Sequence, residues 1–197
     1  MLSTIIRNMK TNESITGIIL AGGKSSRMGS DKAMLTYNGK KLIEYSIGLM
    51  KLVCNTVIIS ASNANYLAFN LPMVSDNYSN IGPLAGLEAS LRHSETRINL
   101  IAPCDNPFLN VEFLNTILNN SENYDAVIPI SNDGKTEPLT GYYSREILPV
   151  IVQQIEKGDY KVQNLLKIIH TKYVLVTDKT LINNINTPND LKSIVQK

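Results

Sequence analysis

The stretch GIILAGGKSSRMGSDK, residues 17–32, joins an apolar run to a segment rich in glycine and basic residues. The run ITGIIL, residues 15–20, is typical of a buried strand because it is short, apolar and rich in β-branched side chains. Glycines after a strand let backbone N–H groups approach an anion closely. Lys24, Arg27 and Lys32 add positive charge to the same segment. The stretch therefore predicts a strand followed by a polyphosphate site.

Two common phosphate-binding patterns do not fit this segment. A P-loop needs a glycine five residues before the Gly-Lys-Ser/Thr triplet, and counting back from Gly23 places Ile18 there. The dinucleotide pattern G-x-G-x-x-G is also absent, because Gly22 and Gly23 are adjacent and the next glycine is Gly29. A P-loop ATPase and a NAD-binding domain are therefore disfavoured. An ordinary strand-to-helix turn with solvated basic residues stays open as the alternative.

Apolar β-branched runs alternate with helical patterns along the chain, which predicts a single Rossmann-like α/β domain. We expect a mostly parallel, twisted, doubly wound sheet with helices on both faces. The expected strands are 15–20, 56–60, 72–75, 98–102, 125–130, 139–143 and 172–176, and the expected helices are 40–53, 84–94, 110–120, 144–157, 163–170 and one from 187 onward. Ligands of such sheets bind beyond the carboxyl ends of the strands. Functional residues should therefore follow strands.

Length and composition fit one globular domain of ordinary size. The chain has 197 residues, a hydrophobic fraction of 43% and a net charge of +2, which gives no drive toward nucleic acid. No apolar run approaches the ~18 residues of a membrane span. Cys54 and Cys104 lack metal-ligand spacing, and a reduced cytoplasmic chain is favoured over a disulfide. We expect a flexible extension over residues 1–14 and the domain over 15–197.

A carboxylate follows the buried run that ends in APCDNP, residues 102–107. Asp105 lies between Pro103 and Pro107, which stiffen the backbone on both sides. Mg²⁺ usually binds one or two carboxylates together with substrate phosphates. Asp105 is therefore a candidate Mg²⁺ ligand, with a turn or helix-capping aspartate as the alternative.

A second carboxylate follows the short strand in VSDNYSNIGPLAG, residues 74–86. Gly82 and Pro83 allow a tight turn into the following helix. A carboxylate such as Asp76 can accept hydrogen bonds from both N1–H and the exocyclic amine of guanine. Asp76 is therefore a candidate base-reading residue, although alone it is equally well explained as a turn residue.

Taken together, these segments resemble a known family. LAGGKSSRMGSDKAML closely resembles the signature L-A-G-G-x-S-x-R-M-G-x-D-K-x-L of the molybdenum cofactor guanylyltransferases, the MobA family. GPLAG and CDNP resemble the second and third motifs in the right order, and EPLTGYY (137–143) and NINTPNDL (184–191) resemble the later ones. The resemblance spans about residues 15–196. It implies a fold similar to that of the nucleotide-diphospho-sugar transferases.

The resemblance also implies a set of site residues. The nucleotide-binding set is Leu20, Ala21, Gly22, Gly23, Lys32, Ser60, Asp76, Gly82 and Asp105. Lys32 would contact the GTP phosphates, Asp76 the guanosine, and Asp105 would hold Mg²⁺, with Mn²⁺ as an alternative ion. Arg27 would join Lys32 and Asp105 in the catalytic set, and Asn184 and Asn186 match a segment linked to pterin binding. Many members have an asparagine where this chain has Ser60, which leaves base recognition open.

The implied reaction is transfer of GMP from GTP to the terminal phosphate of molybdenum-molybdopterin, giving molybdopterin guanine dinucleotide and pyrophosphate. The attacking phosphate is already anionic, so no strong general base is needed. His93 and His170 agree with this, because both are expected in helices away from the motifs. Transient contacts with other molybdenum cofactor proteins are expected, and none with nucleic acid or membranes. Two alternatives stay open: a CTP-dependent cytidylyltransferase acting on molybdopterin or another phosphorylated small molecule, and a non-catalytic nucleotide-binding regulator.

Overall fold

The computed structural model describes residues 13–22, 31–185 and 190. Within them, seven strands form one sheet: β1 (Ile15–Leu20), β4 (Thr56–Ser60), β5 (Met73–Val74), β6 (Ile98–Pro103), β7 (Ala126–Ser131), β8 (Gly141–Ser144) and β9 (Thr171–Val176). Their order is β5-β4-β1-β6-β8-β7-β9. Neighbouring strands are parallel except at β8, which pairs antiparallel with both β6 and β7. The predicted, mostly parallel sheet is confirmed.

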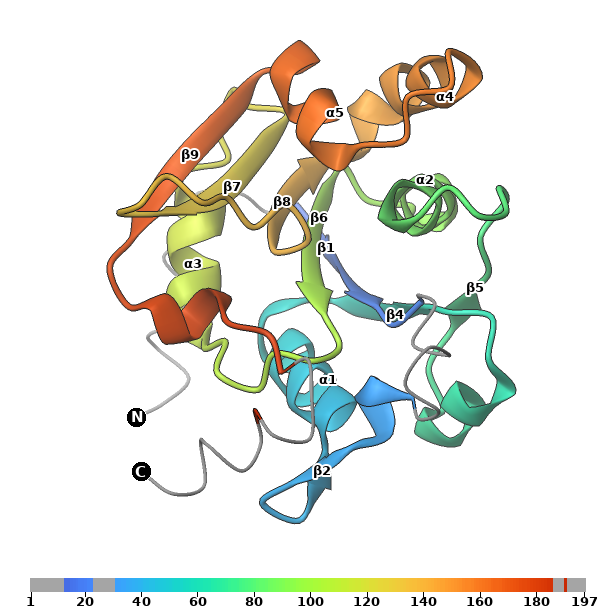
Figure 1. The fold of residues 1–197 in the computed structure, drawn as a ribbon, viewed down its shortest axis with the longest axis vertical. Helices are drawn as coiled ribbons and strands as arrows, with labels where there is room; N and C mark the ends of the chain where they lie inside the picture. Colours follow the sequence, from blue (N-terminus) through green and yellow to red (C-terminus); the bar gives the residue numbers. More distant parts are fainter. Residues whose placement is uncertain (1–12, 23–30, 186–189, 191–197) are drawn as a thin grey trace.

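Helices cover both faces of the sheet, as expected (Figure 1). They are α1 (Leu42–Val53), α2 (Pro83–His93), α3 (Val111–Asn119), α4 (Leu148–Glu156) and α5 (Val162–Ile168). Helices α1 and α3 pack in one hydrophobic cluster, and α2, α4 and α5 pack in the other. The 3₁₀ turns are η3 (Lys32–Met34), η4 (Ala64–Phe69), η5 (Arg145–Ile147) and η6 (Lys179–Ile182).

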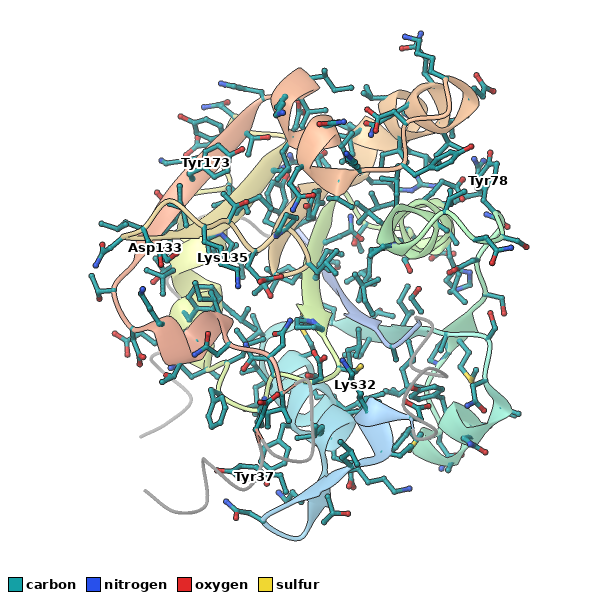
Figure 2. The ribbon with its side chains drawn as sticks, in the orientation of Figure 1. Lys32, Tyr37, Tyr78, Asp133, Lys135 and Tyr173 are labelled. Carbon is teal, nitrogen blue, oxygen red and sulfur yellow. The ribbon has the colours of Figure 1, made fainter. Side chains whose placement is uncertain are left out.

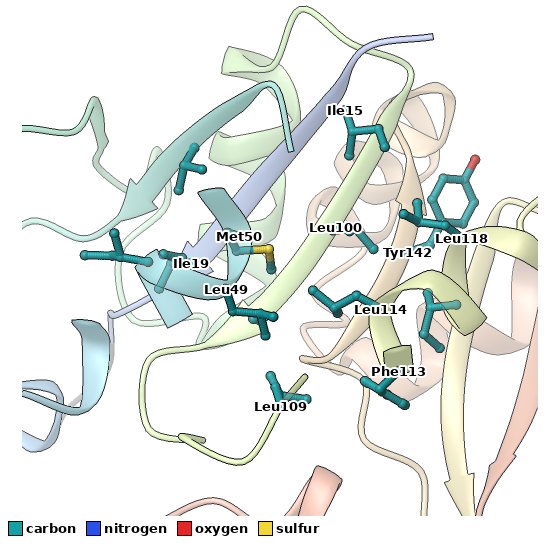
Figure 3. Packing of buried hydrophobic residues seen from close by; sticks show 14 of the residues in the cluster. Ile15, Ile19, Leu49, Met50, Leu100, Leu109, Phe113, Leu114, Leu118 and Tyr142 are labelled. Atoms are coloured by element: carbon teal, nitrogen blue, oxygen red, sulfur yellow. The ribbon is translucent and has the colours of Figure 1, made fainter. Parts of the chain in front are cut away.

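Strand β1 shows how the alternation of side chains divides the core. Ile15 and Ile19 are buried with α1 and α3, whereas Ile18 is buried with α2. Figure 3 shows Ile15 and Ile19 of β1 with Met50 of α1 in the first of these clusters. A Cβ atom at Gly17 would lie 3.0 Å from Cys54 Sγ, so the missing side chain lets α1 approach the strand closely.

Several predicted boundaries need correction. Residues 40–41 belong not to a helix but to β3 (Lys40–Lys41), which pairs with β2 (Thr36–Tyr37). The hairpin turns at Asn38 and Gly39, both with positive φ, as the Asn-Gly dipeptide favours. The predicted helix 144–157 is divided into η5 and α4, where proline occupies the first turn.

The predictions for the two histidines and the two cysteines have different outcomes. His170 lies not in a helix but between α5 and β9, whereas His93 ends α2 as expected. Both Cys54 and Cys104 are free thiols, so no disulfide joins them. Burial raises the pKa of Cys54 to about 12, so this thiol is protonated at neutral pH.

Both ends of the chain fall largely outside the described residues. The extension expected over 1–14 is described only at its last two residues, where the Glu13 carboxylate lies 2.9 Å from the Arg97 guanidinium. The helix expected from 187 onward is described only at Asp190. None of the helices in the described ranges has the length and apolar character needed to span a membrane.

Candidate functional site

A cavity of about 830 Å³ lies at the carboxyl edge of the sheet. Its walls come from the ends of β1, β4 and β6, the segment after β5, the start of α2, and η3. Nine of the predicted site residues line it: Leu20, Ala21, Gly22, Lys32, Ser60, Asp76, Gly82, Asp105 and Asn184. Gly23, Arg27 and Asn186 lie outside the described residues. The structure thus brings together residues that are separated by up to 164 positions in the sequence.

Backbone hydrogen bonds continue past the strand ends and form the floor of the cavity. The Ala21 N–H donates to the Ser60 carbonyl at 3.0 Å, and the Cys104 N–H donates to the Leu20 carbonyl at 3.2 Å. These bonds extend the parallel ladders of β1 with β4 and β6 by one more step. The first residues of the glycine-rich segment and the segment carrying Asp105 therefore lie side by side on a rigid base.

Gly86, which sequence reasoning did not single out, allows α2 to approach the end of β4. A Cβ atom on Gly86 would lie 2.7 Å from Ser60 Oγ and 3.5 Å from Asp76 Oδ1. The absent side chain thus leaves room for two predicted site residues at one wall of the cavity. A glycine inside a helical pattern was the available signal, because such a residue often marks close packing.

Replacing Gly86 with alanine is expected to lower the free energy of unfolding, because the new methyl group collides with Ser60 Oγ. Overpacking costs about 1–3 kcal/mol, which over most of this range is more than the ~1 kcal/mol that alanine gains over glycine in a helix. Adding Ser60→Ala removes the colliding oxygen, so the double variant should unfold at a higher temperature than Gly86→Ala alone. Thermal unfolding of the parent, of Gly86→Ala, of Ser60→Ala and of the double variant checks this. Equal stabilities for Gly86→Ala and the double variant would contradict it.

The segment that carries Asp76 is tied to α2 by a buried carboxylate. Glu88 is fully buried, and its Oε2 accepts a hydrogen bond from Asn77 Nδ2 at 2.9 Å. Its Oε1 lies 2.6 Å from the Arg92 guanidinium in an ion pair. Burial raises the pKa of the Asp76 carboxyl. Asp76 is therefore a partly desolvated acceptor on a loop with a fixed attachment.

Asp105 follows β6 by two residues and lies next to the segment that contains Asn184. The Ile185 N–H donates to the Asp105 carbonyl at 2.8 Å. Asn106 is buried, and its Nδ2 donates to the Leu181 carbonyl at 2.9 Å. These two bonds hold η6 and the residues that follow it against the CDNP segment. Asp105 and Asn184 consequently line the same cavity.

Lys32 begins η3 and faces the same cavity. Figure 2 shows Lys32 on the side toward which the β6 arrow points, away from Asp133 and Lys135. Burial raises the pKa of the Asp105 carboxyl, and the positive charge of Lys32 partly opposes that rise. Asp31 also lines the cavity and accepts a hydrogen bond from the Ala33 N–H at 3.2 Å. Asp31 was missed as a site residue, although it stands in the Asp-Lys pair of the first motif.

The donor set around Asp105 fits Mg²⁺ bound together with a phosphate ligand. Among the residues that the structure describes, no group of three or more His, Cys, Asp or Glu side chains could hold a metal. Asp105 supplies one partly buried carboxylate on the cavity wall. Mg²⁺ needs only one or two carboxylates when water and substrate phosphates supply the other ligands. A metal centre built from protein groups alone does not fit these residues.

Comparisons with known proteins agree on one family. Residues 17–174 match the family model described as MobA-like NTP transferase domain. The chain is 34% identical over 185 residues to the molybdenum cofactor guanylyltransferase of Vibrio campbellii, which covers 91% of this chain and 94% of that protein. Its identity to the enzyme of the same name from Polynucleobacter asymbioticus is 32% over 193 residues, covering 93% of this chain and 97% of that protein.

A solved structure shows the same arrangement of the chain. It is that of molybdopterin-guanine dinucleotide biosynthesis protein A from Archaeoglobus fulgidus, with a TM-score of 0.75 and 26% sequence identity. The superposition covers 90% of this chain and 95% of that one. The similarity thus extends over nearly the whole fold.

Proposed function

The chain is a nucleotidyltransferase that belongs to the MobA-like NTP transferase family, and we propose that it transfers GMP from GTP to the terminal phosphate of molybdenum-molybdopterin. The products are molybdopterin guanine dinucleotide and pyrophosphate. The observation that supports this most directly is one cavity that is lined by Lys32, Asp76 and Asp105 together. A cation, a base-reading carboxylate and a metal-binding carboxylate are the three chemical groups that this reaction needs.

Asp76 and Lys32 are suited to opposite ends of a nucleotide. The Asp76 carboxylate accepts from N1–H and the exocyclic amine of guanine, a pair of donors that cytosine does not present. Lys32 neutralises negative charge on the GTP phosphates. This lowers the repulsion between those phosphates and the attacking anion. Leu20, Ala21 and Gly22, which belong to the same motif as Lys32, line the same cavity. Gly23 and Arg27 stay predictions because they lie outside the described residues.

In the proposed reaction, an oxygen of the molybdopterin phosphate attacks the α-phosphorus of GTP. The bond from that phosphorus to the bridging oxygen of the β-phosphate breaks, and pyrophosphate leaves with the electron pair. The attacking oxygen is already anionic, so charge neutralisation and positioning matter more than proton removal. Neither histidine lines the cavity, and His170 instead contacts the Asn123 carbonyl at 2.9 Å.

Asp105 would hold Mg²⁺, or Mn²⁺ as the alternative ion. When bound, the cation supplies charge neutralisation to the phosphates. Asp105 is well placed for this because its backbone is fixed by β6 on one side and by Ile185 on the other. Because the carboxylate is half-buried, water competes less with the cation for it than at an exposed carboxylate.

We assign the acceptor to the part of the cavity lined by Leu139 and Asn184. Leu139 comes from the EPLTGYY motif, and Asn184 begins the NINTPNDL motif. Both residues come later in the sequence than the nucleotide motifs, but they line the same cavity. Asn186 has the same proposed role and lies outside the described residues. A cytoplasmic location and transient contacts with other molybdenum cofactor proteins stay predictions.

Thermal unfolding with Mg²⁺ and each of GTP, CTP, ATP and UTP tests the nucleotide, and turnover with molybdenum-molybdopterin tests the reaction. A nucleotide at about 100 times its Kd adds ~2.7 kcal/mol, which is a shift of roughly 5–10 °C for a chain of this size. We expect the shift with GTP alone, and pyrophosphate release only when the acceptor is added. A shift with CTP alone would support the cytidylyltransferase, and GTP binding without turnover would support the regulator.

A further inference from the structure

The hydroxyl group of Tyr66 contacts the chain on both sides of residues 23–30. Tyr66 belongs to η4 and is 1% exposed. Its Oη donates to the Asp31 carboxylate, at 2.9 Å from Oδ1 and 2.8 Å from Oδ2. It also lies 3.1 Å from the Ala21 carbonyl oxygen. One side chain from a distant segment thus reaches the last residues before, and the first residue after, the stretch that contains most of the first motif.

Both partners of Tyr66 are themselves fixed. Ala21 is held to the sheet by its hydrogen bond to the Ser60 carbonyl at 3.0 Å. Asp31 caps η3 by accepting from the Ala33 N–H at 3.2 Å. Lys32 lies between Asp31 and Ala33, so its backbone direction depends on the position of the Asp31 carboxylate. The single proton of the Tyr66 hydroxyl is placed to be shared between the Asp31 carboxylate and the Ala21 carbonyl, so it links the residue before Lys32 to the end of β1.

The hydroxyl is not needed for packing. The Tyr66 ring packs near the Phe69 ring, with centroids 6.4 Å apart, in the cluster that covers one face of the sheet. Phenylalanine would fill the same apolar space without the cost of burying a polar group. Burial, with the hydrogen bond to Asp31, raises the pKa of Tyr66, so the group stays a neutral donor. The hydrogen bonds to Asp31 and Ala21 therefore account for the buried hydroxyl of Tyr66.

We propose that Tyr66 is a positioning residue that ties Ala21 to Asp31 and thereby sets Lys32 for the nucleotide phosphates. The inference rests on the proposed function, because it assigns the phosphate end of GTP to Lys32. Tyr66 does not line the cavity, so it acts through Asp31 and Lys32. It should influence the phosphate half of the site and leave the base half unchanged.

The test compares Tyr66→Phe with Tyr45→Phe as a matched control. Tyr45 in α1 also donates its hydroxyl to a backbone carbonyl, that of Tyr37 at 2.7 Å, but does not line the cavity. For each protein, calorimetry measures the affinity for GTP, for pyrophosphate, which presents phosphates only, and for guanosine, which presents the base only. Turnover with the acceptor gives kcat and KM, and thermal unfolding reports stability.

Tyr66→Phe is expected to weaken pyrophosphate and GTP binding by about 10-fold and to lower kcat/KM by about 10–100-fold, the scale of a small misplacement. Guanosine affinity should match that of the parent, and Tyr45→Phe should match it in every binding measurement. Combining Tyr66→Phe with Asp31→Ala should add little to the larger single effect, because both changes remove the contact between these two side chains. If Tyr66→Phe does not fold, Asp31→Ala alone should give the same selective loss.

Two results would overturn the inference. One is a Tyr66→Phe protein with parental pyrophosphate affinity and turnover. The other is an equal loss of guanosine and pyrophosphate binding, which would mean general damage to the site. A parent protein that binds neither GTP nor guanosine would instead contradict the proposed function, so the two failures are distinguishable.

Discussion

Replacing Asp105 with alanine should lower guanylyl transfer by about 10³-fold, the effect of losing several kcal/mol of metal-assisted charge stabilisation. Asp105 supplies the cavity carboxylate to which we assign Mg²⁺. The variant should also lose the dependence of GTP affinity on Mg²⁺, because the cation would have no protein ligand there. Steady-state turnover and GTP titrations with and without Mg²⁺ measure both effects.

Asp133→Ala is the matched control for Asp105→Ala. Asp133 pairs with Lys179 at 2.9 Å on an exposed surface and does not line the cavity. Its removal should leave kcat and the Mg²⁺ dependence unchanged. Near-parental activity of Asp105→Ala itself would mean that the metal assignment is wrong.

The stability of an Asp105→Asn variant gives a further check on the same residue. Burial raises the pKa of Asp105, so the folded state binds this proton more tightly than the unfolded state does. The ionised carboxylate therefore lowers stability above the folded-state pKa, and this cost disappears as the pH falls below the unfolded value. Without nucleotide, Asp105→Asn should unfold at a higher temperature than the parent at pH 7, and the difference should vanish toward acidic pH.

Replacing Lys32 with alanine should lower kcat by about 10²-fold or more, the scale of losing one preorganised charge contact to the reacting phosphates. Lys32 lines the cavity close enough to Asp105 to oppose the rise of that residue's pKa. The loss should fall on kcat and on pyrophosphate affinity more than on guanosine affinity. Steady-state kinetics and the same titrations separate these terms.

Lys51→Ala serves as the control for charge alone, because Lys51 is exposed on α1 and does not line the cavity. Lys32→Arg keeps the charge but changes its geometry, so it should retain part of the activity. An alanine variant as active as the parent would remove Lys32 from the proposed mechanism.

Much of this architecture was readable from residue patterns. The buried runs of β1, β4 and β6 and the Gly82–Pro83 start of α2 were expected close to their observed bounds. Asp76 and Asp105 were expected after strands, and both line the cavity. These features are local, because periodicity and turn residues determine them within about ten positions.

Features that depend on contacts between distant segments were not predictable in the same way. The antiparallel direction of β8 leaves no mark on its own apolar pattern. Tyr66 contacts Asp31, which is 35 positions away in the sequence. The need for glycine at position 86 arises only because Ser60 packs beside it. Such relations arise from the tertiary packing, which a single sequence does not display.

The reversed strand β8 has a consequence for engineering. Because β8 runs antiparallel to β6, the residues that precede it reach the same sheet edge as the residues that follow β6. Leu139 can therefore line the cavity although it comes before its strand, not after it. The loop between β7 and β8 can thus be varied without altering any residue of β1, β4 or β6. A library confined to residues 132–140 should change the choice of acceptor while the parent's preference among nucleotides is kept.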